Sequence, residues 1–150
     1  MIDVGSPFPT FSLQDQDGAV AGNADLKGSK TIVYFYPKDD TPGCTVEACA
    51  FRDNLPRFTG AKVFGVSPDS VKSHRKFVDK FKLNFRILAD VDHALCEACG
   101  VWVQKTLFVK TYMGVERTTF LVDADGIVEK VWRKVKPDGH AAEVQAALEA

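Results

Sequence analysis

The sequence lacks an excess of charge of either sign. Its 150 residues include 19 Lys and Arg against 20 Asp and Glu, which gives a formal net charge of -1. No long-range field therefore favours binding to nucleic acid or to an anionic membrane surface. The chain also lacks an apolar run approaching the roughly 18 residues that a membrane-spanning helix needs. Its first residues show no basic segment followed by an apolar one, so we expect a cytoplasmic protein without nucleic-acid or membrane partners.

Histidine and cysteine are both scarce, with 3 and 4 residues respectively. Without a secretion signal, cysteines are more often catalytic, redox-active or metal-binding than structural staples. Cys96 and Cys99 form one C-x-x-C pair, and the sequence has no second one. A zinc site would have to gather scattered residues, so we expect no metal and no cofactor. We interpret this pair as packing cysteines on a short helix; an accessory redox pair and half of a metal site are the alternatives.

Internal repeats, low-complexity segments and linkers are missing too, which predicts one domain over residues 1–150. Apolar runs without alternation are typical of strands buried on both faces. Asp17-Gly18 is a hairpin turn signal and predicts two short strands around it, followed by a loop over residues 23–30. The remaining strands are expected at residues 31–36, 62–67, 85–89, 118–122 and 127–132.

Helices are expected between these strands. Cys44, Ala48, Phe51 and Leu55 recur at spacings of four, three and four, which predicts one apolar, inward face of a helix over residues 44–58. Pro56 should kink or end this helix near Leu55. Further helices are predicted after Pro68-Asp69, over residues 93–99 with Asp92 as the cap, and after Pro137-Asp138. Residues 101–116 are predicted to be irregular, with possible short strands near residues 107–109.

The alternation of strands and helices predicts an α/β domain with a mainly parallel central sheet flanked by helices. The closing hairpin should add antiparallel pairing at one end, which makes the sheet mixed. This order resembles a thioredoxin-like fold with an N-terminal β-hairpin extension.

The candidate nucleophile is Cys44, which follows a Pro42-Gly43 loop and stands where a helix should begin. The thiolate is the reactive form of cysteine, and an unperturbed thiol with a pKa of about 8.5 is mostly protonated at neutral pH. Unpaired N–H groups and the positive end of the helix dipole favour an anion at this position. The hydroxyl of Thr41 could donate to the thiolate or to an oxygen of a bound substrate, and Pro42 could shield the sulfur. A small buried cysteine on an apolar face is the alternative.

The motif around Cys44 resembles the active-site signature of peroxiredoxins. Pro37, Thr41 and Cys44 have the spacing Pro-x-x-x-Thr-x-x-Cys, and the segment from Cys44 to Cys49 is similar to the subfamily called bacterioferritin comigratory protein, or PrxQ. The likeness extends along nearly the whole chain. Its other segments are Phe11-Ser12-Leu13-x-Asp15-x-Asp17-Gly18, Asp90-x-Asp92-His93 and Arg117-x-x-Phe120-Leu121-Val122-Asp123.

The resemblance implies a role for each matching residue. Cys44 would be the peroxide-reducing cysteine and Cys49 its resolving partner. Arg117 would lie beside the thiolate. Substrate contacts would come from Arg117 and from the loop residues Pro37, Thr41, Pro42 and Gly43.

The implied reaction is reduction of hydrogen peroxide and organic hydroperoxides by a monomer without a cofactor. Cys44 would become a sulfenic acid and condense with Cys49, and thioredoxin or a similar dithiol would reduce the disulfide.

Helix geometry adds a condition to this disulfide. Two residues five apart in an α-helix have Cα atoms roughly 8.6 Å apart, beyond the limit of about 7 Å for a disulfide. If Cys44 and Cys49 share a helix, it must unwind locally before they can bond.

Two other functions remain open at this point. A redox sensor or binding module could use Cys44 and Cys49 as a switch with little turnover. A general disulfide oxidoreductase is a third possibility, but that class normally carries C-x-x-C after a strand. Peroxide turnover separates these functions.

Overall fold

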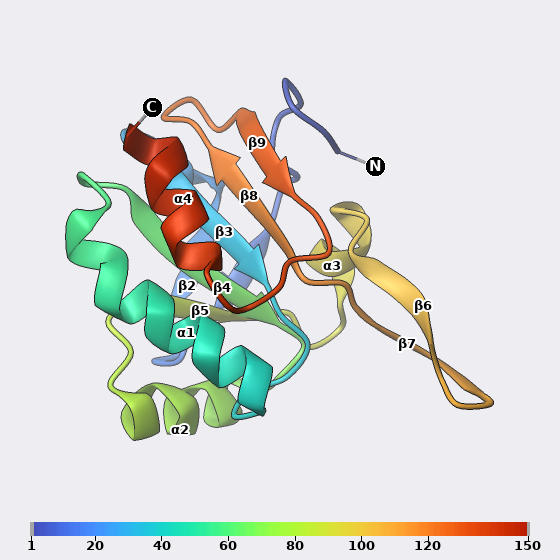
Figure 1. The fold of residues 1–150 in the computed structure, drawn as a ribbon. Coiled ribbons are helices and arrows are strands. Elements are labelled where there is room, and N and C mark those ends of the chain that lie inside the picture. The colour runs from blue at the N-terminus through green and yellow to red at the C-terminus, as the bar shows by residue number, and fades with distance from the viewer. Residues whose placement is uncertain (1, 150) are drawn as a thin grey trace.

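The computed structural model describes residues 2–149 and shows one central sheet with helices on both faces (Figure 1). The sheet has seven strands in the order β2-β1-β5-β4-β3-β8-β9, and β6 and β7 form a separate pair. The strands are β1 (Ser12–Gln14), β2 (Val20–Gly22), β3 (Thr31–Phe35), β4 (Lys62–Ser67), β5 (Arg86–Ala89), β6 (Trp102–Leu107), β7 (Lys110–Val115), β8 (Thr118–Val122) and β9 (Val128–Trp132). The helices are α1 (Pro42–Asn54), α2 (Val71–Phe81), α3 (Ala94–Ala98) and α4 (His140–Glu149), with 3-10 turns at Asn23–Leu26 and Leu55–Arg57.

The predicted α/β class and mixed sheet are confirmed, but the expectation of mainly parallel pairing is wrong. β3 pairs with β4, and β4 with β5, in parallel. The other pairings of this sheet are antiparallel, including that of β3 with β8. The first hairpin pairs with β5 and so extends the sheet beyond its parallel centre.

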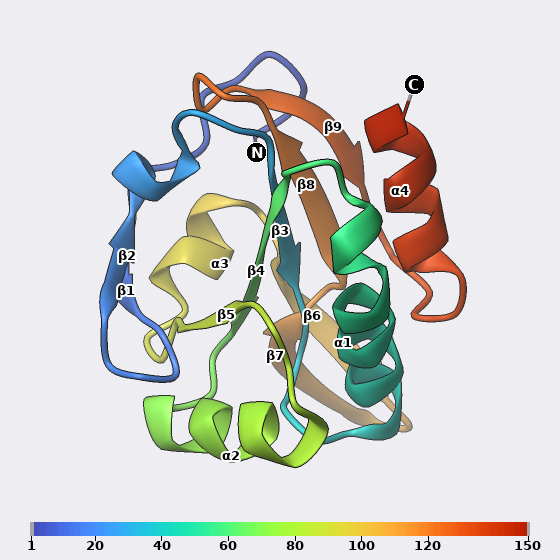
Figure 2. The same cartoon turned by 90° about the vertical axis from the view of Figure 1, so that its left-hand side faces the viewer.

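Strand β3 separates two apolar cores, because all five of its residues are buried and their side chains alternate between the two faces. Ile32 and Tyr34 point into the core beneath α1, α2 and α4. Val33 and Phe35 point into the opposite core, which α3 and the N-terminal segment cover. Figure 2 shows α3 and α1 on opposite sides of the sheet.

Helix α1 forms largely as the periodicity predicts. It begins at Pro42, where a proline costs no helical hydrogen bond, and ends at Asn54. The early end near Leu55 is confirmed, since Pro56 lies in a 3-10 turn. Cys44, Ala48 and Phe51 are buried on one face, so the inward orientation of Cys44 is confirmed as well.

Three local predictions are wrong. Residues 102–115 form the β6–β7 hairpin, not an irregular segment. Most of its residues are exposed, so no buried face imposes a pattern on the sequence. Asp92 is not the capping residue of α3, because His93 adopts that position. Asp92 does accept the N–H of Ala94 at 3.3 Å, while the Asp90 carboxylate accepts the N–H groups of Leu95 and Cys96. Finally, the predicted loop at residues 23–30 contains the turn Asn23–Leu26.

No helix within residues 2–149 has both the length and the apolar character needed to cross a membrane.

Candidate active site

Cys44 occupies the first turn of α1 and is 1% exposed. Thr41 caps this helix with extended backbone, and its carbonyl accepts the first helical hydrogen bond, from the Thr45 N–H at 2.9 Å. Helix geometry leaves the N–H groups before Thr45 without partners inside the helix. Cys44 therefore lies where both the helix dipole and free donors favour a negative charge.

Arg117 reaches this cysteine from a distant part of the chain. It immediately precedes β8, whose Thr118 pairs with Phe35, so it lies beside the point where β3 leaves the sheet. Its Nη2 donates to Cys44 Sγ at 3.0 Å and its Nη1 donates to Glu47 Oε1 at 3.1 Å. The predicted approach of Arg117 to the nucleophile is thus present in the structure.

The close approach of Arg117 depends on glycine at position 43. A Cβ atom on Gly43 would lie 2.9 Å from Arg117 Nη2 and 3.4 Å from Pro137 Cγ. Real Cβ atoms essentially never come closer than 3.0 Å to a heavy atom. Any larger residue would therefore push the guanidinium away from the sulfur.

Glu47 belongs to the site, although we assigned no role to it from the sequence. It lies one helical turn after Cys44 and is only 2% exposed. Burial raises its pKa to about 7, against the opposing effect of the Arg117 charge and hydrogen bond. The spacing of three residues from Cys44, which places both on one face of α1, is the signal that could have identified it.

A second charged residue near the site is Lys105, which belongs to strand β6. Burial and the charge of Arg117 lower the pKa of this β6 lysine. The β6–β7 hairpin therefore lies close enough to the site for its charges to act there, although it projects from the rest of the fold in Figure 1.

The loop residues differ from the predicted arrangement in one respect. The Thr41 hydroxyl donates to the Lys38 carbonyl at 3.0 Å, so in this state it does not donate to the Cys44 sulfur. Pro37 is half-buried at the start of the loop. Pro42 is exposed at the first position of α1.

Cys49 lies in the same helix as Cys44 and is partly exposed, and both thiols are free. Their spacing in α1 places the Cα atoms roughly 8.6 Å apart. Because this distance exceeds the limit of about 7 Å for a disulfide, the helix must unwind before the two cysteines can bond.

Cys96 and Cys99 have no exposed surface and pack in the core next to α3. Burial raises the pKa of both thiols well above the usual range, and the nearby Asp90 carboxylate raises them further. The structure supports the interpretation of these residues as packing cysteines.

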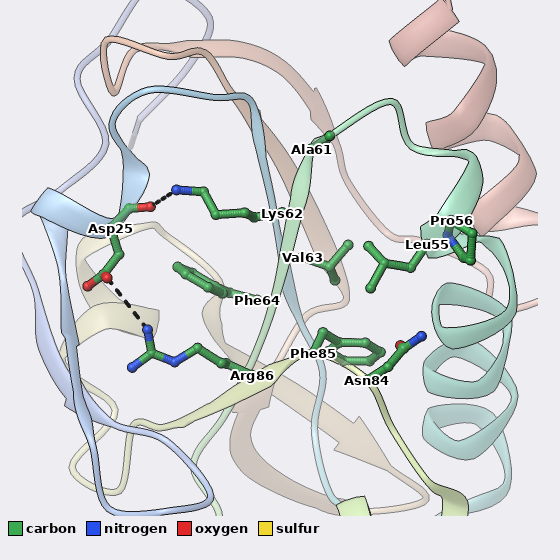
Figure 3. A pocket seen from close by; sticks show the side chains of 11 residues that line it. Asp25, Leu55, Pro56, Ala61, Lys62, Val63, Phe64, Asn84, Phe85 and Arg86 are labelled. Carbon is green, nitrogen blue, oxygen red and sulfur yellow. Dashed lines mark hydrogen bonds and ion pairs between the residues drawn. The ribbon is translucent and has the colours of Figure 1, made fainter.

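A hollow of about 510 Å³ lies at the end of the sheet where β4 and β5 begin (Figure 3). Its wall includes Leu55, Val63 and Phe85. The cations at its rim already bind Asp25: Lys62 donates to the carbonyl and Arg86 lies 3.5 Å from the carboxylate. The hollow contains no cysteine, so the chemistry stays with Cys44.

Comparison with known proteins identifies the family of the chain. Residues 4–131 match the model of the AhpC/TSA family. A putative peroxiredoxin bcp of Coxiella burnetii is 52% identical, over 98% of this chain and 99% of that protein. Peroxiredoxin Bcp of Bacillus subtilis is 47% identical, over 98% and 95%.

Solved structures show the same relationship. A Xanthomonas campestris bacterioferritin comigratory protein, studied for alkyl peroxide reduction, has a TM-score of 0.88 and 44% identity over 93% of this chain and 90% of its own. A Xylella fastidiosa PrxQ mutant has a TM-score of 0.94 and 35% identity over 99% and 96%. These neighbours confirm the thioredoxin-like fold. The chain therefore belongs to the AhpC/TSA family and, within it, to the Bcp/PrxQ peroxiredoxins, which are thiol peroxidases.

Proposed function

We propose that Cys44 is the nucleophile of this peroxidase and that Arg117 is its electrostatic partner. The supporting observation is the hydrogen bond of 3.0 Å from Arg117 Nη2 to Cys44 Sγ at the start of α1. A guanidinium and a helix N-terminus aimed at one sulfur favour the thiolate.

The thiolate attacks the terminal oxygen of a hydroperoxide, and the O–O bond breaks as the S–O bond forms. The products are the Cys44 sulfenic acid and, after protonation from solvent, water or an alcohol. Charge develops on the leaving oxygen, where Arg117 and the free N–H groups of the first helical turn can stabilise it. Gly43 admits the guanidinium, and Pro37, Thr41 and Pro42 shape the loop that presents the sulfur to the substrate.

The substrate class is hydrogen peroxide and organic hydroperoxides. The first reaction needs only the outer oxygen, so the rest of the peroxide can vary. The alkyl peroxide reduction studied in the Xanthomonas campestris relative supports the organic part of this range.

Cys49 then condenses with the sulfenic acid, releasing water and forming a disulfide. The partial exposure of Cys49 supports this role, because an external dithiol has to reach the pair afterwards. We assign recycling to thioredoxin or a similar dithiol, acting on a cytoplasmic monomer.

The decisive experiment measures peroxide consumption with thioredoxin, its reductase and NADPH. The wild-type protein should turn over, and Cys44→Ser should be inactive. Cys49→Ser should still form the sulfenic acid, seen with a dimedone probe, but should lose thioredoxin-dependent recycling. Full activity in Cys44→Ser would refute the assignment. Disulfide formation without sustained turnover would instead favour a redox sensor.

A further inference from the structure

A buried hydrogen-bond network lies immediately before the active-site helix. We call it the Asp39 network and define it as Tyr36, Asp39, Ser73 and His74. The Asp39 carboxylate accepts hydrogen bonds from the Tyr36 hydroxyl through Oδ1 and from the Ser73 hydroxyl at 2.8 Å through Oδ2. The same Oδ2 lies 2.7 Å from His74 Nδ1. The loop that leaves β3 is thereby attached to α2, beside which it lies in Figures 1 and 2.

His74 secures the other end of the network. Its side chain has no exposed surface, and its Nε2 lies 3.0 Å from the Leu88 carbonyl. A carbonyl oxygen only accepts, so Nε2 carries a proton. The Asp39 backbone N–H donates in turn to Asp69 Oδ2 at 2.8 Å. Asp39 is therefore held through both side chain and backbone, and its removal would leave several buried polar groups without partners.

The same atoms do not form a convincing metal site. Ligand atoms of Asp39, Asp69 and His74 lie within 4.8 Å of one another. However, the hydroxyls of Tyr36 and Ser73 and the Asp39 N–H point their hydrogens at these carboxylates. Donors directed at the oxygens occupy the lone pairs that a cation would need.

The network ends where the active-site segment begins. Asp40, the next residue, has a φ of 57°, and its carboxylate makes only an exposed ion pair with Lys80. Thr41 then caps α1. Bringing Cys44 to Cys49 requires a Cα shift of roughly 3 Å, from the helical distance to a disulfide distance. The five Cα-to-Cα steps from Asp39 to Cys44 can span about 16 Å when extended, so Asp39 need not be released.

We propose that the Asp39 network is the fixed end of the unwinding segment and remains formed in both the reduced and the disulfide states. This inference rests on the proposed roles of Cys44 and Cys49. The anchor confines unwinding to the residues after Asp39, so the sulfenic acid at Cys44 stays close to Cys49. Asp39, Ser73 and His74 are thus positioning residues for the resolving step.

The anchor decides between two fates of the sulfenic acid. Condensation with Cys49 releases water and gives the disulfide. A second hydroperoxide instead transfers an oxygen, leaves as water or alcohol and gives a sulfinic acid. Because the network keeps Cys44 close to Cys49 after unwinding, it speeds their condensation. It therefore favours the disulfide over the sulfinic acid.

The test measures the ratio of sulfinic acid to disulfide by mass spectrometry over a range of peroxide concentrations in a single turnover. Asp39→Asn loses a charged acceptor and should raise this ratio roughly tenfold, given the strength of hydrogen bonds to charged groups. Ser73→Ala removes one donor to Asp39 and should raise the ratio by a smaller factor. The backbone N–H of residue 73 can still donate to the Ser70 hydroxyl that caps α2. The matched control is Asp40→Asn, which breaks an exposed ion pair in the same loop and should leave the ratio unchanged.

Hydrogen exchange supplies the second measurement. In the wild-type disulfide form, residues 36–39 should stay protected while residues 42–49 lose protection; in oxidised Asp39→Asn, residues 36–39 should lose it too. Loss of protection at residues 36–39 in oxidised wild type, an unchanged ratio in both variants, or a lower ratio in Asp39→Asn would overturn the proposal. Failure of the wild type to form the Cys44–Cys49 disulfide would refute the proposed function instead.

Discussion

At the scale of single residues, the site depends on the space available around Arg117. The guanidinium donates hydrogen bonds to two acceptors, the Cys44 sulfur and the Glu47 side chain. Gly43 leaves room for it, and no other side chain would fit without moving it. Three residues of α1 therefore fix one arginine that belongs to another part of the chain.

Gly43→Ala tests this dependence. Alanine has the higher helix propensity, so the substitution should not weaken the helix itself. It should nevertheless lower the second-order rate of peroxide reduction by roughly 10²-fold, the scale for loss of one aligned donor. Stopped-flow kinetics measure the rate, and thermal unfolding checks the fold. Thr45→Ala, in the same turn, is the control and should keep its rate; an unaltered rate in Gly43→Ala would contradict the packing argument.

Glu47 should make the stability of the protein depend on pH. Burial raises its pKa to about 7 from 4.5, so the folded state binds this proton more tightly than the unfolded state. The resulting stabilisation is fully present below pH 4.5 and is lost as the pH rises through 7. The full span corresponds to roughly 3 kcal/mol.

Glu47→Gln removes this titration. Urea unfolding of wild type and variant at pH 5 and pH 8 should show the wild type losing stability relative to the variant as the pH rises. Parallel pH dependence of the two proteins would show that Glu47 does not titrate in this range.

At the scale of elements, α1 has to serve two incompatible states. As a helix it presents Cys44 to Arg117; as a helix it also keeps Cys49 out of bonding distance. The Leu55–Arg57 turn gives α1 a defined end, and the buried Phe51 holds its middle against the sheet. The first two turns are therefore the part of the helix free to unwind.

Hydrogen exchange should show this directly. Residues 42–49 should exchange faster in the disulfide form than in the reduced form, while β3 should exchange slowly in both. The Cys49→Ser protein, which cannot close the intramolecular disulfide, should retain the reduced pattern after peroxide treatment. Identical exchange in the two wild-type forms would show that α1 does not unwind.

The elements also show what the sequence could predict. β3, α1 and β8 carry strong apolar patterns because they face a core, and all three were predicted. The β6–β7 hairpin faces solvent along most of its length, so no periodic pattern marks it. At α3 the predicted Asp92 accepts one N–H group, whereas the two bonds from Leu95 and Cys96 go to Asp90, which lies further from the helix in the sequence.

The site divides in the same way. Cys44 could be identified from its loop and helix start, because those signals are local. Arg117 could not be identified by such reasoning, since its role depends on the pairing of β3 with β8; the family resemblance supplied it. The buried state of Glu47 depends on the same pairing, and only the structure shows it.

At the scale of the whole molecule, two pairs of cysteines occupy different environments. Cys44 and Cys49 lie in a helix that has to open locally, whereas Cys96 and Cys99 lie inside a core that opens only when the fold is lost. The same residue type therefore has a proposed catalytic role on one face of the sheet and packs in the core on the other.

Thiol labelling at increasing urea concentrations should separate the pairs. Cys49 should react with the label without denaturant. Cys96 and Cys99 should react only in the fraction of molecules that is globally unfolded at each urea concentration. Peptide mapping identifies each labelled position, and the unfolding curve by circular dichroism is the reference. Labelling of Cys96 or Cys99 in native buffer at the rate of Cys49 would contradict their place in the core.

The antiparallel register of β3 and β8 brings together two residues that lie 73 positions apart. Until that pairing exists, Cys44 lacks the hydrogen bond from Arg117 and should behave as an ordinary cysteine. A newly made or denatured chain should therefore meet peroxide without the reactivity of the finished enzyme. Folding therefore activates Cys44. Rapid oxidation of Cys44 by peroxide should begin only when Cys49 is also in place to resolve the sulfenic acid.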